Sequence, residues 1–454
     1  MGSIGIQEQI QCPLLEPRFS ALKQSIIKPE NKQKVVGSYK RLVKACHQEA
    51  ALIGKAGPSI VPEIDFEDVV QNGGELPEGL VDLVRDRGCI IFRNVVPSEQ
   101  AEAWEAELKD YTKRHSAVGG FPADNPQSWS LWWTRPQVQI RSHPRVLAAV
   151  NTISKLWHVS DPNAPVDLSA QVAYPDRFRI RYPTNDAEFT LNAHVDCGST
   201  ERWEDPTYRA NYQAILDGEW EKYDGWNADN RVDAQTDLYH RGGNCSCWRS
   251  MQGWLSLSHT GTGHGTLRLL PSLKTSTAYL MLRPFFLDGD DVFDDVTSRF
   301  PGAHPGGTQV LPTTELHPDL MMEKSIVGIP PVKPGDYVFW HCDLIHEVDK
   351  FHPGSTDSSV VYNASTPLVP YNIDSLRATR QSFLDAKPPR DFNGIGYLHE
   401  EEHMHEDHGA RQVNILSDEG RRAMGFDKFN VDETGLSEGA RKVRQMANEV
   451  LGNA

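Results

Sequence analysis

The chain is short of basic residues and contains no long apolar run. Its 454 residues include 46 lysines and arginines against 62 aspartates and glutamates, which gives a formal net charge of −16. This surplus of negative charge excludes nucleic acid and anionic membranes as the main partners, because both repel an acidic surface. No stretch approaches the roughly 18 apolar residues that a membrane-spanning helix needs. We therefore expect a protein that neither binds nucleic acid nor enters a membrane.

The cysteines are too few and too scattered for a disulfide framework. There are seven of them, an odd number spread over a long chain. Such usage is typical of reduced thiols in a reducing compartment. The first residues also lack the apolar core of a secretory signal. The expected location is therefore cytoplasmic.

The remaining composition is that of an ordinary globular protein with many turns. Apolar residues make up 39% of the chain, with 35 glycines and 30 prolines. A chain of this length buries a sizeable core without disulfides or metals. Because no internal repeat or low-complexity linker is present, we expect one large domain with extensions at both ends.

Helical patterns dominate the first part of the chain. Residues 1 to about 60 are polar, with a helical pattern over 31–52 and little sign of strands. A short apolar run at 88–96 follows a glycine and predicts a buried strand. A helix with Ser98 as its N-cap is then expected to run to about Arg114 and to cover that strand.

Beyond residue 170 the pattern changes to short strands rich in β-branched and aromatic residues and bounded by turn residues. The expected strands are Phe178–Tyr182, Phe189–His194, Met251–Leu257, Thr266–Leu270, Thr277–Phe285, Ser325–Ile329, Asp336–His341 and Ser358–Ala364. About eight such strands favour an α+β protein with a double-stranded β-helix core of the jelly-roll or cupin kind.

These patterns predict three parts. Residues 1–85 form a helical N-terminal extension, 86–370 the double-stranded β-helix domain, and 371–454 a C-terminal extension. A long polar insert at 198–244 interrupts the strands. Because a structureless loop of that length is rare in a compact domain, we expect it to fold as short helices over the mouth of the barrel.

The first candidate site is His194 and Asp196, at the end of a predicted strand. Residues i and i+2 of a strand point to the same side, so an imidazole and a carboxylate would face one point. The pair alone is weak evidence, because on this pattern His194 is better explained as a hydrogen-bonded histidine at the rim of the barrel.

The second candidate is the stretch that begins at Pro334 and contains His341 and His346. The two histidines are five positions apart, so along one continuous strand they face opposite sides, and only one points inward unless a turn intervenes. An inward histidine together with His194 and Asp196 makes two histidines and one carboxylate. This is the ligand set of non-haem Fe(II) oxygenases, which leaves positions open for a bidentate co-substrate and O2.

The order of these motifs along the chain carries a resemblance. It resembles the phytanoyl-CoA dioxygenase group of Fe(II)/2-oxoglutarate oxygenases and, more closely, the family catalogued as domain of unknown function 1479. The resembling stretches are Met251–Trp254, Gly265–Ser272, Ala278–Phe285, Gly335–His346 and Gly420–Gly425. The resemblance implies that His194, Asp196 and His346 bind Fe(II), and that His341 lies beside the metal or in the pocket.

One feature of the related oxygenases is missing. Many of them place an arginine or lysine roughly 10 to 14 residues after the distal histidine, where it binds the far carboxylate of 2-oxoglutarate. Here that window is Thr356–Val360 and contains no basic residue. We assign co-substrate binding to Arg249, Arg283 and Trp254, which lie in resembling segments or just before one. Other strand arginines that remain candidates are Arg179, Arg181 and Arg268.

Three further motifs match known signatures only in part. His399–His403 fits the zinc-protease pattern HExxH, but the residues between the histidines are all glutamate, which indicates an exposed acidic segment. Thr260–Gly265 resembles a phosphate loop but joins two β segments, so we interpret it as a hairpin turn. The aromatic cluster Trp129–Trp133 is interpreted as part of the core.

The sequence thus predicts an oxidoreductase: an Fe(II)/2-oxoglutarate-dependent dioxygenase that uses O2 to oxidise a small organic molecule. Two alternatives stay open because of the missing downstream arginine. One is a cupin-like metal enzyme that does not use 2-oxoglutarate, and the other is a cupin-like binding protein without turnover.

Overall fold

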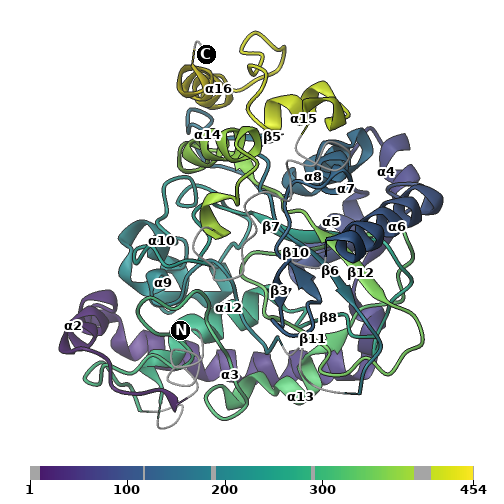
Figure 1. The fold of residues 1–454 in the computed structure, drawn as a ribbon. Coiled ribbons are helices and arrows are strands. Elements are labelled where there is room, and N and C mark those ends of the chain that lie inside the picture. Colours follow the sequence, from purple (N-terminus) through teal and green to yellow (C-terminus); the bar gives the residue numbers. More distant parts are fainter. Residues whose placement is uncertain (1–10, 116–117, 186–190, 288–291, 393–410, 453–454) are drawn as a thin grey trace.

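The computed structural model describes residues 11–115, 118–185, 191–287, 292–392 and 411–452 (Figure 1). It is a mixed α/β structure built on a large mixed sheet. Eight strands form this sheet in the order β1-β2-β10-β7-β12-β6-β4-β3, with β1 and β2 parallel and the other neighbours antiparallel. The strands are β1 (Glu63–Asp65), β2 (Cys89–Arg93), β3 (Gly120–Phe121), β4 (Ser128–Trp129), β6 (Phe178–Arg181), β7 (Met251–Ser256), β10 (Tyr337–His341) and β12 (Ser358–Tyr362).

A smaller sheet faces part of the large one. It has the order β11-β8-β9, with β8 (Leu267–Leu269), β9 (Val327–Gly328) and β11 (His346–Val348). A separate pair joins β5 (Asp167–Gln171) to β13 (Pro367–Leu368). The chain passes from the large sheet to the small one twice, from β7 to β8 and from β10 to β11. Both of these connections end near the space between the two sheets.

Helices enclose the sheets on several sides. The helices that precede β5 in the chain are α2 (Pro17–Ile26), α3 (Lys32–Ala56), α4 (Phe66–Gln71), α5 (Glu78–Arg87), α6 (Ser98–Arg114), α7 (Arg135–Ser142) and α8 (Pro144–Ser154). The later ones are α12 (Leu273–Leu282), α13 (Met322–Ser325), α14 (Pro370–Leu384), α15 (Asp418–Ala423) and α16 (Glu438–Leu451).

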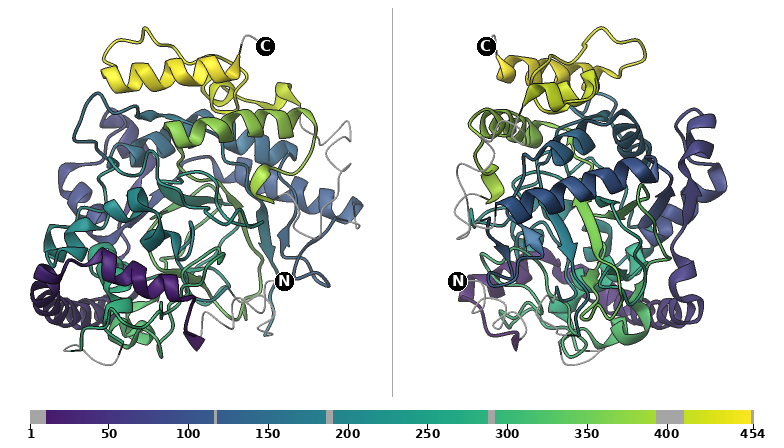
Figure 2. Two further views of the ribbon diagram at one scale, coloured as in Figure 1. Left: turned by 90° about the vertical axis from the view of Figure 1, so that its left-hand side faces the viewer. Right: turned by 45° about the vertical axis from the view of Figure 1, so that its right-hand side comes forward.

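The two ends of the chain build opposite ends of the molecule. The long helix α3 packs against α12 and α13, whereas α14 and α16 pack against each other at the other end (Figure 2). Between them, α6 and α8 join the core of the large sheet, where Leu108 and Val150 belong to the same apolar cluster as Phe92 and Phe339. Burial of the apolar side chains of these helices and strands is the main contribution that stabilises their packing.

The first predicted strand and helix are confirmed, with one correction at the cap. β2 and α6 follow each other as expected, but Pro97 occupies the N-cap position and Ser98 is the first helical residue. The Ser98 hydroxyl donates instead to the carbonyl oxygen of Pro334 at 2.8 Å. This bond ties the start of α6 to the turn before β10.

The prediction of a strand at Thr277–Phe285 is wrong, because this segment lies in α12 and in the 3-10 turn Arg283–Phe285 that follows it. Every residue of α12 from Ser276 to Leu282 is buried. A helix buried on all sides has no polar face, so its apolar run has the same pattern as a buried strand. Ser325–Ile329 forms only the two-residue β9, and the predicted strand at Phe189–His194 begins outside the described residues.

The segment Thr260–Gly265 connects β7 of the large sheet to β8 of the small one. It is therefore a crossover between sheets, and its interpretation as a hairpin turn is wrong. The insert at 198–244 does form short helices, as predicted: α9 (Glu201–Glu204), α10 (Pro206–Ala210), α11 (Gln213–Leu216) and a 3-10 turn at Trp220–Lys222.

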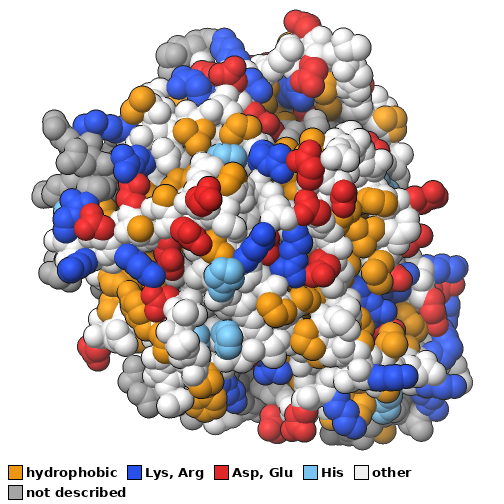
Figure 3. All heavy atoms as spheres, turned by 90° about the vertical axis from the view of Figure 1, so that its right-hand side faces the viewer, with side chains coloured by type: hydrophobic (Ala, Val, Ile, Leu, Met, Phe, Trp, Pro, Cys, Tyr) orange, Lys and Arg blue, Asp and Glu red, His pale blue; other side chains and the backbone are white. Residues whose placement is uncertain are grey.

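The charged side chains on one face of the molecule are dispersed rather than gathered. On the face shown in Figure 3, acidic and basic side chains are interspersed, with no broad area of one sign. All seven cysteines are free thiols, in agreement with the expected lack of disulfides. Within the described ranges, no helix combines the length and the apolar character needed to cross a bilayer.

Candidate metal centre

A short antiparallel bridge brings His194 and His346 together. The backbone N–H of His194 donates to the carbonyl oxygen of His346 at 2.9 Å, and the reverse bond is 3.0 Å long. His346 is the first residue of β11, and a turn separates it from His341, the last residue of β10. This turn interrupts the alternation of side chains along β10. The side chain of His346 can therefore face inward although it lies five residues after the end of that strand. The ring centroids of His194 and His346 lie 4.1 Å apart.

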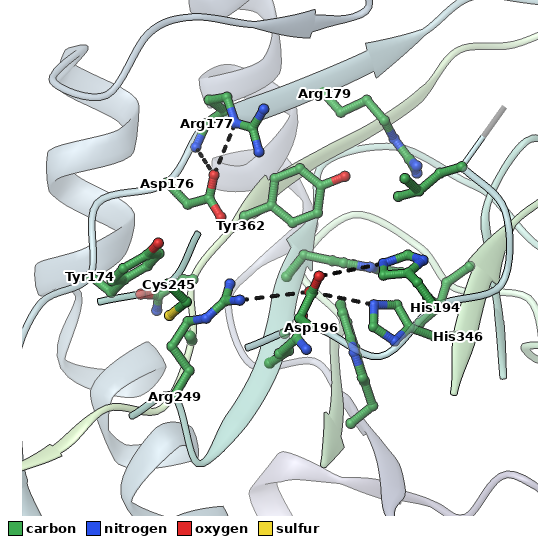
Figure 4. Close-up of a pocket in the computed structure, with 18 of the residues that line it drawn as sticks. Tyr174, Asp176, Arg177, Arg179, His194, Asp196, Cys245, Arg249, His346 and Tyr362 are labelled. Carbon is green, nitrogen blue, oxygen red and sulfur yellow. Dashed lines mark hydrogen bonds and ion pairs between the residues drawn. The ribbon is translucent and has the colours of Figure 1, made fainter. Parts of the chain in front are cut away.

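The carboxylate of Asp196 completes the group. Its Oδ1 lies 3.7 Å from Nε2 of His194, and its Oδ2 lies 3.8 Å from Nε2 of His346 (Figure 4). The three donor atoms all lie within 4.8 Å of one another. Two ligands about 2.1 Å from one metal ion lie about 3 to 4 Å apart, so the group fits a single ion.

Backbone carbonyls fix the tautomer of both imidazoles. Nδ1 of His194 lies 2.7 Å from the carbonyl oxygen of Asn192, and Nδ1 of His346 lies 2.9 Å from that of Leu344. A carbonyl oxygen only accepts, so each neutral ring carries its proton on Nδ1 and leaves a lone pair on Nε2. Metal-binding histidines are typically oriented in this way.

The groups that surround Asp196 keep it ionised. Burial raises the pKa of Asp196, but His194, Arg249 and His346 outweigh this effect and hold the pKa of the carboxyl well below its usual range. Nε2 of Gln309 donates to Oδ1 at 2.6 Å, and Nη2 of Arg249 lies 3.6 Å from Oδ2. Burial and the proximity of His194 lower the pKa of His346 to about 3. At neutral pH, Asp196 and His346 are thus in the forms that bind a metal.

The group opens onto a pocket of about 190 Å³ between the two sheets. From the small sheet come Leu267, His346 and Val348, and from the large sheet Trp254 and Tyr362. In the register of the large sheet, Trp254 of β7 lies directly opposite Tyr362 of β12. Residues opposite each other on neighbouring strands share a face. Other residues of the large sheet that line the pocket are Arg179, Gln252 and Trp340.

The structure brings Arg249 and Trp254 to this pocket but not Arg283. Arg283 lies in the 3-10 turn after α12, where Nε donates to the carbonyl of Leu316 at 2.6 Å and Nη1 donates to that of Phe286. Arg283 is therefore not among the residues that line the pocket, because its segment is helical rather than a strand as expected. In Figure 4, Arg249 approaches Asp196 from one side, and Arg179 lies on the other side of the pocket.

His341 lies outside the pocket, contrary to what the resemblance implied. Its ring stacks on Trp157 at 4.8 Å. Nε2 lies 3.0 Å from the carbonyl oxygen of Gly225, and Nδ1 accepts from the backbone N–H of Asp343 at 3.0 Å. Both nitrogens are therefore occupied, and the adjacent group of His341, Cys342 and Asp343 is not arranged to bind a metal although its donor atoms are close together.

Sequence reasoning missed Gln309 and Tyr362 as pocket residues. Gln309 precedes Val310, which bridges to Val195; no pattern in the sequence connects these distant segments. Tyr362 lies within the predicted strand Ser358–Ala364. The alternation of side chains along that strand was the available sign that Tyr362 faces the pocket. Trp132 and Trp133 are buried among apolar residues and are not among the residues that line the pocket. The HExxH match at His399–His403 lies outside the described residues.

Comparison with known proteins gives relatives that cover most of the chain. The solved structure of GlcNAc Inducible Gene 2 (DUF1479) from Candida albicans is 39% identical and superposes with a TM-score of 0.88, over 97% of this chain and 95% of that one. A structure from Salmonella typhimurium LT2, provisionally described as an oxidoreductase, is 27% identical with a TM-score of 0.77, over 90% and 97% of the two chains.

A curated relative, the uncharacterized protein YbiU of Escherichia coli strain K12, is 28% identical over 383 residues, which is 82% of this chain and 86% of the relative. The model of the Gig2-like family matches residues 13–426. The chain therefore belongs to the Gig2-like family.

Proposed function

We propose that the protein is an Fe(II)/2-oxoglutarate-dependent oxygenase that oxidises a small organic molecule. The observation that carries the proposal is the group of His194, Asp196 and His346, whose donor atoms converge at the wall of a pocket. Two histidines and one carboxylate on one side of a metal are the ligands of non-haem Fe(II) oxygenases. The provisional description of the Salmonella relative as an oxidoreductase agrees with this class.

The proposed core is a double-stranded β-helix over 86–370, as in the phytanoyl-CoA dioxygenase group, with the insert at 198–244 and with extensions at 1–85 and 371–454. Two facing sheets joined by crossovers at β7–β8 and β10–β11 support this assignment. The pairing of β1 with β2 adds a short strand from the N-terminal extension to the edge of the large sheet.

Within this proposal, the protein's own residues hold, orient and shield the reacting groups. Bound Fe(II) would supply the oxidising chemistry, together with 2-oxoglutarate and O2. His194 and His346 keep Nε2 available through their bonds to Asn192 and Leu344. Gln309 orients the carboxylate by donating to one of its oxygens.

Two of the three arginines that line the pocket provide charge for a dicarboxylate. Arg249 is placed to meet a carboxylate beside the metal, because its guanidinium already lies 3.6 Å from Asp196. Arg179 projects from β6 on the other side of the pocket and is placed to meet the distal carboxylate. The forked guanidinium suits carboxylates at both positions, and Trp254 forms an apolar wall between the strands.

An anaerobic titration tests the proposal. Fe(II) followed by 2-oxoglutarate is expected to give a weak visible charge-transfer band, which is lost in His194→Ala. The exposed His158 lies away from the pocket, so His158→Ala is the matched control and should keep the band. Under air, the wild type should form succinate. A wild type with neither the band nor succinate would rule out the oxygenase.

The lack of a basic residue at 356–360 keeps two alternatives open. One is a cupin-like binding protein without turnover, and the other is a cupin-like metal enzyme that does not use 2-oxoglutarate. In either case the wild type would bind Fe(II), and His194→Ala would not, but 2-oxoglutarate would cause no spectral change and would not protect the protein from unfolding.

A further inference from the structure

Asp343 lies at the centre of a fully buried charge network behind the metal centre. Its Oδ1 accepts from Arg202 at 2.6 Å and its Oδ2 accepts from Arg231 at 2.6 Å. The hydroxyl of Tyr212 donates to Oδ1 at 2.9 Å, and that of Tyr223 lies 3.3 Å from Oδ2. All of these partners belong to the insert at 198–244. The side chains of Asp343, Arg202 and Arg231 are each no more than 5% exposed.

This network touches both segments that carry the proposed metal ligands. The second Nη of Arg202 donates to the backbone carbonyl of Asp196 at 2.5 Å. Asp343 itself lies in the turn between β10 and β11, three residues before His346. The carbonyl of Leu344, in the same turn, orients the imidazole of His346.

One guanidinium therefore spans from the turn before His346 to the backbone of Asp196. A planar arginine that forms two directed bonds fixes the relative position of the groups that it joins. The side chain of Asp343 does not line the pocket, so it acts only through these neighbours.

We propose that Asp343 is a positioning residue of the metal centre. Held by Arg202 and Arg231, it sets the distance between Asp196 and the segment that ends in His346. The insert at 198–244 is thereby a structural part of the metal site and not only a cover over it. The inference rests on the proposed function insofar as a metal binds at His194, Asp196 and His346.

A purely structural role for the network makes a different prediction. Removal of one partner from a buried ion pair destabilises a protein wherever the pair is located, because it leaves the other charge uncompensated. A loss of stability alone is therefore no evidence for positioning. Metal affinity and the spectrum of the bound metal distinguish the two roles, since groups that orient metal ligands typically change affinity by roughly 10- to 100-fold.

The test uses the full chain and Co(II), titrated anaerobically and followed by its visible d–d absorption, which reports the coordination geometry. Asp343→Asn is expected to bind Co(II) roughly 10- to 100-fold more weakly than the wild type, with an altered spectrum. The matched control is Asp167→Asn, which removes a buried carboxylate that accepts from Arg444 at 2.6 Å. The control should lose stability and keep the affinity and spectrum of the wild type.

A second variant covers the case in which Asp343→Asn does not fold. In Arg202→Lys, a single ammonium replaces the fork and cannot reach both Asp343 and the carbonyl of Asp196, so affinity should fall and the spectrum should change. Wild-type affinity and spectrum in a folded Asp343→Asn or in Arg202→Lys would overturn the inference and leave the metal site intact. A wild type that does not bind Co(II) would overturn the proposed function as well.

Discussion

Arg249 lines the pocket, and its guanidinium lies 3.6 Å from the carboxylate of Asp196. We expect Arg249→Lys to weaken the binding of 2-oxoglutarate by about 10- to 100-fold without abolishing metal binding. A charge-assisted hydrogen bond is worth about 1.5–3 kcal/mol, and lysine cannot reproduce the forked geometry. Isothermal titration of the Mn(II)-loaded protein measures the effect.

The control for this experiment is Arg283→Lys. Because Arg283 binds the carbonyls of Leu316 and Phe286, its replacement should leave the affinity for 2-oxoglutarate unchanged. If both variants bound the co-substrate as the wild type does, Arg249 would not be a ligand, and Arg179 would be the next residue to replace.

His341 gives a prediction about pH. Burial lowers its pKa to about 4, although Asp343 partly opposes the shift. In the unfolded chain its pKa is about 6.5. Between these values the unfolded state binds the extra proton, so the contribution of His341 is complete above pH 6.5 and is lost as the pH falls towards 4. Between pH 6.5 and 5 the loss from this residue is about 2 kcal/mol.

Urea unfolding at pH 7 and pH 5 measures this loss. His341→Asn does not titrate, so it should be less stable than the wild type at pH 7 and should lose less stability on acidification. The other buried histidines are common to both proteins and cancel in the comparison. Equal losses in the two proteins would show that His341 does not titrate in this range.

The sequence predicts the proposed metal ligands better than their surroundings. His194 and Asp196 were recognisable by their spacing, and the resemblance distinguished His346 from His341. Gln309 had no such signal, because its place beside Asp196 depends on the bridge between Val195 and Val310. Pairing between distant segments is a property of the tertiary structure, which local patterns do not encode.

At the scale of elements, β7 depends on a glycine. A Cβ on Gly253 would lie 2.8 Å from the carbonyl oxygen of Val338 and 2.8 Å from the ring of Phe339, both in the neighbouring β10. We expect Gly253→Ala to destabilise the protein by about 1–3 kcal/mol, as overpacking of a core does. Denaturant unfolding measures the change.

Gly79 in α5 serves as the control for this substitution, because a Cβ there meets nothing within 4 Å. Gly79→Ala should be neutral or should stabilise the helix by up to about 1 kcal/mol. Equal effects at both positions would contradict the close approach of β10 to β7.

Short strands bounded by turn residues were predictable even where they are buried, and the buried helix was not. The strands β6, β7, β8, β10 and β12 were recognised by their length and their bounding turns. α12 was mistaken for a strand, because Ser276–Leu282 are all buried and therefore show no helical period. What decides its structure is packing against α3, which lies far away in the sequence.

For the whole molecule, the proposed metal site predicts that metal binding and stability are coupled. A ligand that binds only the folded state stabilises it by about 2.7 kcal/mol at a hundred times its Kd. We therefore expect saturating Mn(II), a redox-stable substitute for Fe(II), to raise the Tm by several degrees, and EDTA to reverse the effect. Scanning calorimetry measures both changes.

His346→Ala is the control, because the variant retains the fold but loses one of the three ligands. Its Tm should not respond to Mn(II). A similar increase in the variant and the wild type would place the stabilising metal elsewhere on the acidic surface of the protein.

The pairing of β2 with β10 determines when this protein completes its fold on the ribosome. β2 ends at Arg93, whereas its antiparallel neighbour begins at Tyr337. The apolar side chains of Ile90 and Phe92 gain that neighbour only after most of the chain has been synthesised. Domains usually fold as units in the order of their synthesis. We therefore expect β2 to stay without this neighbour, and its apolar side chains to stay accessible, until Tyr337–His341 has been synthesised.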